Sequence, residues 1–382
     1  MKQPIYLLFI FLIVLFSCKE NISDEPTTHE SSQESTNSGP KNIILLIGDG
    51  MGISQITAGM YRNGNQLELE RCKSIGLIKT NSKKELITDS SAGATAFATG
   101  KKTRNGMVSQ SMEDSANYKT FIEYAEENKK STGLVVSSTV THATPACFYA
   151  HYPRRYNANE PISAQFVNSG VEVLIGGGKK YFENRKDGRN LLEELSKKGY
   201  TVLDTLTSGF DTKEVFKMVY LYAPTQPGKL VFTEGDEAPS RGPILPLGTQ
   251  KAIDVLEKDT NGFFLMVEGS QIDWGGHNND SEYIINEMLD FNKSVKIALD
   301  FAEKNKETLV IITADHETGG YAIIEGKLDG SQMTGGFSTK HHSASMIPVF
   351  AYGKGEEVFS GIYDNTAIFY KMMDAFGFQT TD

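Results

Sequence analysis

Residues 42–52 read Asn-Ile-Ile-Leu-Leu-Ile-Gly-Asp-Gly-Met-Gly, an apolar run that ends in glycines around one acid. Such a run is typical of a strand buried on both faces of a parallel sheet and followed by a tight turn. Similar short runs recur along the chain, separated by longer amphipathic stretches. We predict strands at residues 42–47, 133–136, 171–175, 263–267, 308–312 and 347–352. This alternation predicts an α/β fold.

The amphipathic stretches predict helices that pack on the sheet. Residues 284–302 carry apolar side chains at helical spacing and form the clearest example. No second linker or internal repeat follows Lys41, so we expect a single domain over residues 41–382. Residues 184–246 do not follow the alternation, and we expect an insertion or a peripheral lobe there.

Composition and charge exclude several classes of protein. The 382-residue chain is 39% hydrophobic, which supplies a sizeable core and excludes disorder over most of its length. It carries 38 Lys and Arg against 48 Asp and Glu, for a formal net charge of -10. Because this charge repels a phosphate backbone, a nucleic acid is not expected as a specific partner.

The first 40 residues predict export. An apolar run from Ile5 to Phe16 is shorter than the roughly 20 residues of a spanning helix, so we predict a signal peptide at residues 1–17. Residues 15–18, Leu-Phe-Ser-Cys, resemble a bacterial lipobox and make Cys18 the expected lipid-bearing residue. The alternative is an ordinary signal peptide cleaved nearby. Residues 18–40 are polar and predict a flexible tether.

These features predict a protein of the periplasm or cell envelope, attached to a membrane through its lipid anchor. Apart from Cys18, the chain contains only Cys72 and Cys147 as cysteines. They are too few and too far apart for a disulfide scaffold, and either one bridge or two buried thiols would fit them.

Acidic and imidazole side chains follow the predicted strands. In open parallel sheets the carboxyl ends of the strands form one ligand-binding edge, so side chains placed there converge. Alone, each such loop is also typical of a turn or of a solvated acidic segment. The acids concerned are Asp49, Glu268, Asp273 and Asp315.

Five of the seven histidines lie in the same loops, whereas packing roles would scatter them: His142, His277, His316, His341 and His342. Imidazole and carboxylate together, without thiolate, favour Zn²⁺, with a harder ion where oxygen ligands dominate. The combination therefore predicts a metal centre.

Residues 88–100 begin with Thr-Asp-Ser-Ser and continue with small residues, which predicts a helix capped near Asp89 or Ser90. Backbone amides at such a start stabilise an anionic oxygen, so a hydroxyl there is a candidate nucleophile. The alternative is a plain capping motif on a packing helix. A nearby divalent ion favours the nucleophile, because it lowers the pKa of a coordinated hydroxyl.

Taken in order, the motifs at residues 49–52, 88–90, 267–277 and 313–316 and the late histidine before residues 347–349 resemble those of the alkaline phosphatases. The resemblance runs from about Lys41 to Gly353. It implies a three-layer αβα domain with a large, mostly parallel central sheet. It also implies hydrolysis of small-molecule phosphate monoesters through a phosphoserine, in an enzyme that forms a homodimer.

The resemblance assigns roles to matched side chains. Ser90 looks like the nucleophile, and Arg155 like the guanidinium that grips two phosphate oxygens, with Arg154 as the neighbouring alternative. For the late histidine, His342 fits the spacing better than His341. The implied metal ligands are Asp49, Asp315 and His316 for one Zn²⁺, Asp273, His277 and His342 for the other Zn²⁺, and Asp49, Glu268, Thr144 and His142 for a third ion, Mg²⁺ in the family.

The chain departs from the well-known bacterial enzymes at two positions. His142 stands where they carry an aspartate, and losing a hard anionic oxygen should weaken the preference for Mg²⁺ and favour Zn²⁺ or Co²⁺. Trp274 stands where they often carry a lysine, so phosphate should be held less tightly and Arg155 should contribute more. The alternative is family variation without a large effect.

Other functions share many of these features. A phosphodiesterase or sulfatase of the same superfamily would share the metal ligands. However, the Arg155 clamp suits a monoester, which offers two free oxygens on phosphorus. A lipid-anchored protein that merely binds zinc or phosphate would leave Ser90 idle.

Overall fold

The computed structural model describes residues 39–380 apart from residues 232 and 234. The predicted signal peptide, Cys18 and nearly all of the predicted tether lie outside the described residues. Gly39–Asp382 form one compact unit. Within the described residues, no helix combines the length and apolar character needed to cross a bilayer.

A ten-stranded sheet forms the middle of this unit, in the order β14-β2-β13-β8-β1-β7-β3-β4-β6-β5. β13 pairs antiparallel with both β2 and β8, and the other pairs are parallel. The predicted strands are all present, as β1 (Asn42–Gly48), β3 (Ser131–Thr139), β4 (Val173–Gly177), β7 (Phe263–Gly269), β8 (Thr308–Thr313) and β13 (Ile347–Gly353). Four further strands of the sheet were not predicted, β2 (Ser74–Lys79), β5 (Thr201–Leu203), β6 (Met218–Ala223) and β14 (Gly361–Asp364).

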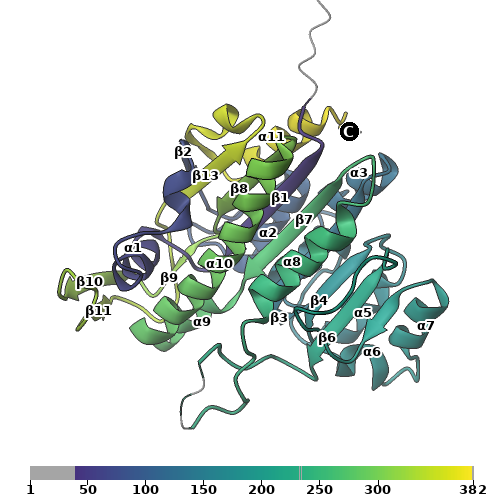
Figure 1. Ribbon diagram of the computed structural model, residues 1–382, viewed down its shortest axis with the longest axis horizontal. Helices are drawn as coiled ribbons and strands as arrows, with labels where there is room; N and C mark the ends of the chain where they lie inside the picture. The colour runs from purple at the N-terminus through teal and green to yellow at the C-terminus, as the bar shows by residue number, and fades with distance from the viewer. Residues whose placement is uncertain (1–38, 232, 234, 381–382) are drawn as a thin grey trace, which may run out of the picture. The chain divides into compact units, whose positions relative to one another are not determined.

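Helices cover both faces of the sheet, which is why β1, β7 and β8 are buried along their whole length. α8 (Ile244–Leu256) and α10 (Ser281–Asn305) pack on one face, in front of the sheet in Figure 1. α3 (Phe121–Glu127) and α4 (Ala143–Tyr149) pack on the strands from the other face, and α2 (Ser90–Thr99) packs on α4. The predicted three-layer α/β fold is therefore confirmed.

The remaining elements connect these layers. The helices are α1 (Ile53–Arg62), η1 (Glu68–Arg71), α5 (Asn159–Phe166), α6 (Lys180–Glu183), α7 (Leu191–Lys197), α9 (Gln271–Asn278), η2 (Glu356–Phe359) and α11 (Ala367–Phe376). The short strands are β9 (Glu317–Thr318) with β12 (His342–Ser343), and β10 (Tyr321–Glu325) with β11 (Thr334–Phe337).

The segment 184–246, for which we expected an insertion or a peripheral lobe, contains α7 and the sheet strands β5 and β6. These strands extend the central sheet beyond β4, and the chain then returns through a long connection to α8. Cys72 and Cys147 are both buried and free, so of the two alternatives the structure has the pair of thiols.

Four adjacent strands in the middle of the sheet bring the predicted site residues together. In the order β8-β1-β7-β3, they end beside Asp315, Asp49, Glu268 and His142. The parallel register places Ile47 of β1 opposite both Glu268 of β7 and Thr313 of β8. The convergence expected at the carboxyl edge of a parallel sheet is present.

Candidate active site and metal centre

Among the described residues, three groups of acidic and histidine side chains have ligand atoms within 4.8 Å of one another, and the first consists of Asp49, Asp315 and His316. All three side chains are buried, and His316 Nε2 lies 3.6 Å from Asp49 Oδ1 and 3.3 Å from Asp315 Oδ2. Both oxygens of Asp49 and Oδ2 of Asp315 lack a hydrogen-bond partner. Buried carboxylate oxygens without a donor are costly, so this arrangement suits a cation.

Asp273, His277 and His342 form the second group. His277 Nδ1 donates to the carbonyl of Lys340 at 2.6 Å, and His342 Nδ1 donates to the carbonyl of Thr88 at 2.8 Å. These bonds direct both Nε2 atoms, which lie 3.2 Å apart, toward Asp273, whose carboxylate oxygens lie 3.3 Å from His277 Nε2 and 3.6 Å from His342 Nε2. Asp273 raises the pKa of His277 to about 9, so without an ion this ring holds a proton where a cation could bind. One oxygen with two nitrogens is a donor set typical of Zn²⁺.

Asp49 also belongs to the third group, with Glu268 and His142. Ser270 Oγ donates to Glu268 Oε2 at 2.6 Å, whereas Glu268 Oε1, His142 Nδ1 and Thr144 Oγ1 are buried without partners. Unpartnered oxygen and nitrogen donors again point to an ion. The donors mix carboxylate, hydroxyl and one imidazole, so this site is less exclusively oxygen-rich than a typical Mg²⁺ site.

The pKa values of the buried acids reflect the same excess of negative charge. Burial, followed by the charges of Asp315 and Asp273, raises the pKa of Asp49 well above its usual range. Burial and Asp273 raise the pKa of Asp315 to about 8, and burial raises that of Glu268 to about 7. Burial lowers the pKa of His142 to about 3, so its imidazole is neutral and able to bind a metal. Divalent cations would replace the protons that these carboxyls otherwise hold.

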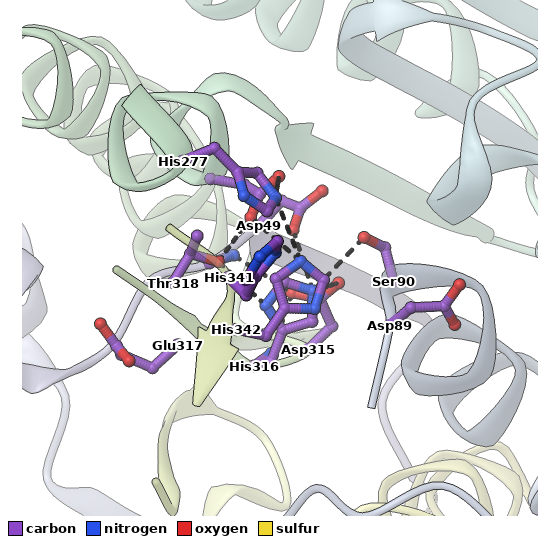
Figure 2. A network of polar contacts seen from close by, with 12 residues as sticks. Asp49, Asp89, Ser90, His277, Asp315, His316, Glu317, Thr318, His341 and His342 are labelled. Carbon is purple, nitrogen blue, oxygen red and sulfur yellow. Dashed lines mark hydrogen bonds and ion pairs between the residues drawn. The ribbon is translucent and has the colours of Figure 1, made fainter. Parts of the chain in front are cut away.

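Ser90 is the first residue of α2 and is 3% exposed. Asp89 is the N-cap, as expected, and accepts a hydrogen bond from the backbone amide of Ala92 at 2.9 Å. Ser90 Oγ lies 3.3 Å from His316 Nε2 and points into the Asp and His cluster (Figure 2). The hydroxyl therefore lies beside one metal group, at the positive end of a helix dipole.

Arg155 lies beside the same helix start. Its Nε lies 4.0 Å from Asp89 Oδ2, and this buried Nε lacks a hydrogen-bond partner. Both guanidiniums lie over the Tyr156 ring, that of Arg155 at 4.6 Å and that of Arg154 at 5.8 Å, but Arg154 is exposed. Of the two adjacent arginines, Arg155 is the one placed near Ser90.

The structure also shows where the two remaining candidates, His341 and Trp274, lie. His341 is exposed, with its ring 6.5 Å from that of His277, and it belongs to none of the three groups. The Trp274 ring lies edge-on to that of His142, at 5.9 Å between centroids. Trp274 is thus placed beside the third group.

Sequence reasoning missed Thr318. Its hydroxyl donates to Asp273 Oδ1 at 2.5 Å and accepts from His316 Nδ1 at 3.2 Å. It thereby links the first two groups and leaves His316 Nε2 free to face Ser90 and the carboxylates. The only signal in the sequence is its position two residues after His316, which places it on the same side of an extended chain.

Comparisons with known proteins agree with this geometry. The Alkaline phosphatase family model matches residues 40–335. Alkaline phosphatase 4 of Bacillus subtilis is 32% identical over 90% of this chain and 90% of its own length. Alkaline phosphatase 3 of the same organism is 42% identical over 74% of this chain, which spans 62% of that relative.

A solved structure is also similar. Alkaline phosphatase from the Antarctic bacterium TAB5 superposes with a TM-score of 0.81 at 40% identity, covering 90% of this chain and 99% of that one. Variants of that enzyme with a histidine replaced by glutamate or aspartate hold Mg in a site called M3. From the fold, the placed side chains and these matches together, the chain belongs to the alkaline phosphatase family of metal-dependent phosphomonoesterases.

Proposed function

We propose that this chain hydrolyses phosphate monoesters through a phosphoserine formed on Ser90. The observation that carries the proposal is the position of Ser90 Oγ, 3.3 Å from His316 Nε2 among carboxylate oxygens that lack donors. When bound, divalent ions would neutralise the attacking and leaving oxygens of the transferring phosphoryl group. Asp49, Asp315 and His316 would hold one ion, and the Asp273 group described above would hold the other.

The reaction would then proceed in two steps, in which Ser90 and Arg155 have separate roles. In the first step the Ser90 hydroxyl loses its proton and Oγ forms a bond to phosphorus as the bond from phosphorus to the leaving oxygen breaks, and the leaving oxygen takes up a proton. In the second step water loses a proton as it bonds to phosphorus, and Ser90 Oγ departs and takes up a proton, so phosphorus retains its configuration. Arg155, held near Asp89, would grip two non-bridging oxygens in both steps.

We propose that the third site accepts Zn²⁺ or Co²⁺ more readily than Mg²⁺, or holds Mg²⁺ loosely, because His142 supplies neutral nitrogen. The Mg-containing carboxylate variants of the similar TAB5 enzyme support this. We also propose that Trp274 lines the phosphate site without a cation, which leaves more of the binding to Arg155.

A direct comparison of substrates and a trapping experiment test the main proposal. Hydrolysis of p-nitrophenyl phosphate should exceed that of its bis ester, and a faster bis ester would indicate a phosphodiesterase. Radiolabelled phosphate should be captured on Ser90 at acid pH in the native protein and lost in Ser90→Ala. Absence of label in the native protein would indicate a metal-binding or phosphate-binding lipoprotein. Elemental analysis should find two zinc-like ions and a weaker third.

We further propose that the protein is exported, lipid-anchored at Cys18 and homodimeric. The apolar run before Cys18 and the family resemblance support these assignments. Labelling with a palmitate analogue, lost in Cys18→Ala, tests the anchor. Light scattering on the protein without its first 38 residues tests the dimer, since Gly39–Asp382 form a compact unit by themselves.

A further inference from the structure

We propose that Glu317 is a positioning residue that holds His316 and His342, and with them two metal sites, in one fixed arrangement. The inference rests on the proposed function, since it concerns the groups proposed to bind the ions beside Ser90. Glu317 follows His316 directly, yet it belongs to none of the three candidate metal groups. In Figure 2 it lies on the side of the cluster away from Ser90.

Glu317 as a residue is only 5% exposed, and its carboxylate accepts hydrogen bonds from several segments. Oε1 accepts from Gln55 Nε2 at 2.8 Å and from the backbone amide of Tyr321 at 3.0 Å. Oε2 accepts from the backbone amide of Gly320 at 3.2 Å and from Ser343 Oγ. A buried carboxylate with this many donors is held in one orientation.

The bond to Ser343 reaches the second metal group. β9 and β12 pair antiparallel, with Glu317 opposite Ser343 and Thr318 opposite His342. The Glu317 side chain therefore links β9, which directly follows His316 of the first group, to β12, which carries His342 of the second group. Because each strand has only two residues, side-chain bonds supply much of what holds the pair in register.

The opposite side of Glu317 is anchored to the turn that carries Asp49. A Cβ on Gly52 would lie 2.5 Å from Glu317 Cγ and 2.9 Å from Gln55 Oε1. The φ of Gly52 is -82°, a value open to any residue, so close approach and not backbone conformation requires glycine there. Gln55 Nε2 donates to the carbonyl of Thr318 as well, at 2.8 Å. One contact set thus connects the Asp49 turn, β9 and β12.

The charge of Glu317 matters because every partner described is a donor. In Glu317→Gln the new amide would turn one N–H₂ group toward two of these donors, so about half of the bonds would be lost. Groups that orient metal ligands typically change metal affinity or activity by about 10- to 100-fold when removed. We therefore expect an effect on metal retention, not merely on stability.

The test measures zinc release from the zinc-loaded protein to a colorimetric chelator, well below the melting temperature of each variant. Glu317→Gln should release zinc at least about tenfold faster than the native protein. Ser343→Ala removes one partner and should give a smaller change in the same direction. Glu172→Gln is the matched control. Glu172 also accepts a hydrogen bond from a backbone amide, that of Thr132 on β3 at 2.8 Å, but it lies away from the metal groups.

The control should leave zinc release within about twofold of the native rate, whichever way it moves the melting temperature. Native-like release from Glu317→Gln, with or without a lower melting temperature, would overturn the inference and leave the proposed function intact. If that variant does not fold, native-like release from Ser343→Ala would do the same. A native protein that retains no zinc and forms no phosphoserine would instead refute the proposed function.

Discussion

Removing the ions should expose the electrostatic strain of the site, and Asp315→Asn should relieve part of it. In the folded, metal-free protein the pKa of Asp315 is raised from 3.8 to about 8, chiefly by burial and then by Asp273. Between these values the folded state keeps a proton that the unfolded chain has lost. Stability of the metal-free protein should therefore fall as pH rises from about 4 to about 8.

The magnitude follows from the size of this interval. It spans about four pH units, and each unit is worth about 1.4 kcal/mol, so the full effect is on the order of 5 kcal/mol. Asp315→Asn removes the titration and keeps the acceptor Oδ1, which receives the amides of Gly50 at 3.2 Å and His316 at 3.0 Å. The new amide nitrogen would donate to His316 Nε2, which now lies 3.3 Å from Oδ2.

The assay is urea denaturation of both proteins with a chelator present, at intervals from pH 5 to pH 9. Metal-free Asp315→Asn should become the more stable of the two as pH rises, and its pH slope should be shallower by close to one proton. With zinc restored, the native protein should be the more stable of the two, because its site binds zinc better than that of Asp315→Asn. Parallel pH dependences for the two metal-free proteins would refute the reasoning.

Further predictions concern individual ligands and the clamp. His142→Asp should restore a requirement for Mg²⁺, measured by activity against added metal, and an unchanged requirement would contradict the argument from donor type. Arg155→Lys should lower kcat/KM about 10- to 100-fold, because a point charge replaces a bidentate fork; a value close to native would show that Arg155 does not grip the phosphoryl group. Asp49→Asn should deplete two ions by elemental analysis whereas Glu268→Gln depletes only the third, and equal depletion would exclude the sharing of Asp49.

The buried strands and the residues at their ends could be predicted from the sequence because both signals are local. Residues 42–47 are apolar at every position except Asn42, and such a short run has few interpretations other than a buried strand. Asp49 and Asp315 follow their strands directly, so the topology of a parallel sheet was enough to bring them together. Asp89 was predicted as a cap from the hydroxyl, acid and small residues around it.

Other features depend on contacts that no local pattern encodes. β2 alternates buried and exposed positions near one edge of the sheet, and β5 has only three residues, so neither gives a long apolar run. Thr318 and Glu317 act through partners that are distant in sequence, such as Gln55 and Asp273. Their roles emerge only once β9 and β12 are seen to pair.

The order of the strands explains why one carboxylate serves two metal groups. β1 lies between β8 and β7, and neighbouring strands in a sheet are about 4.8 Å apart. A side chain at the end of the middle strand can therefore reach ligands from either side, which is the position of Asp49 between Asp315 and Glu268. The spacing of the strands thus lets one carboxylate belong to both groups, and burial at this sheet edge, followed by the charges of Asp315 and Asp273, raises the pKa of Asp49.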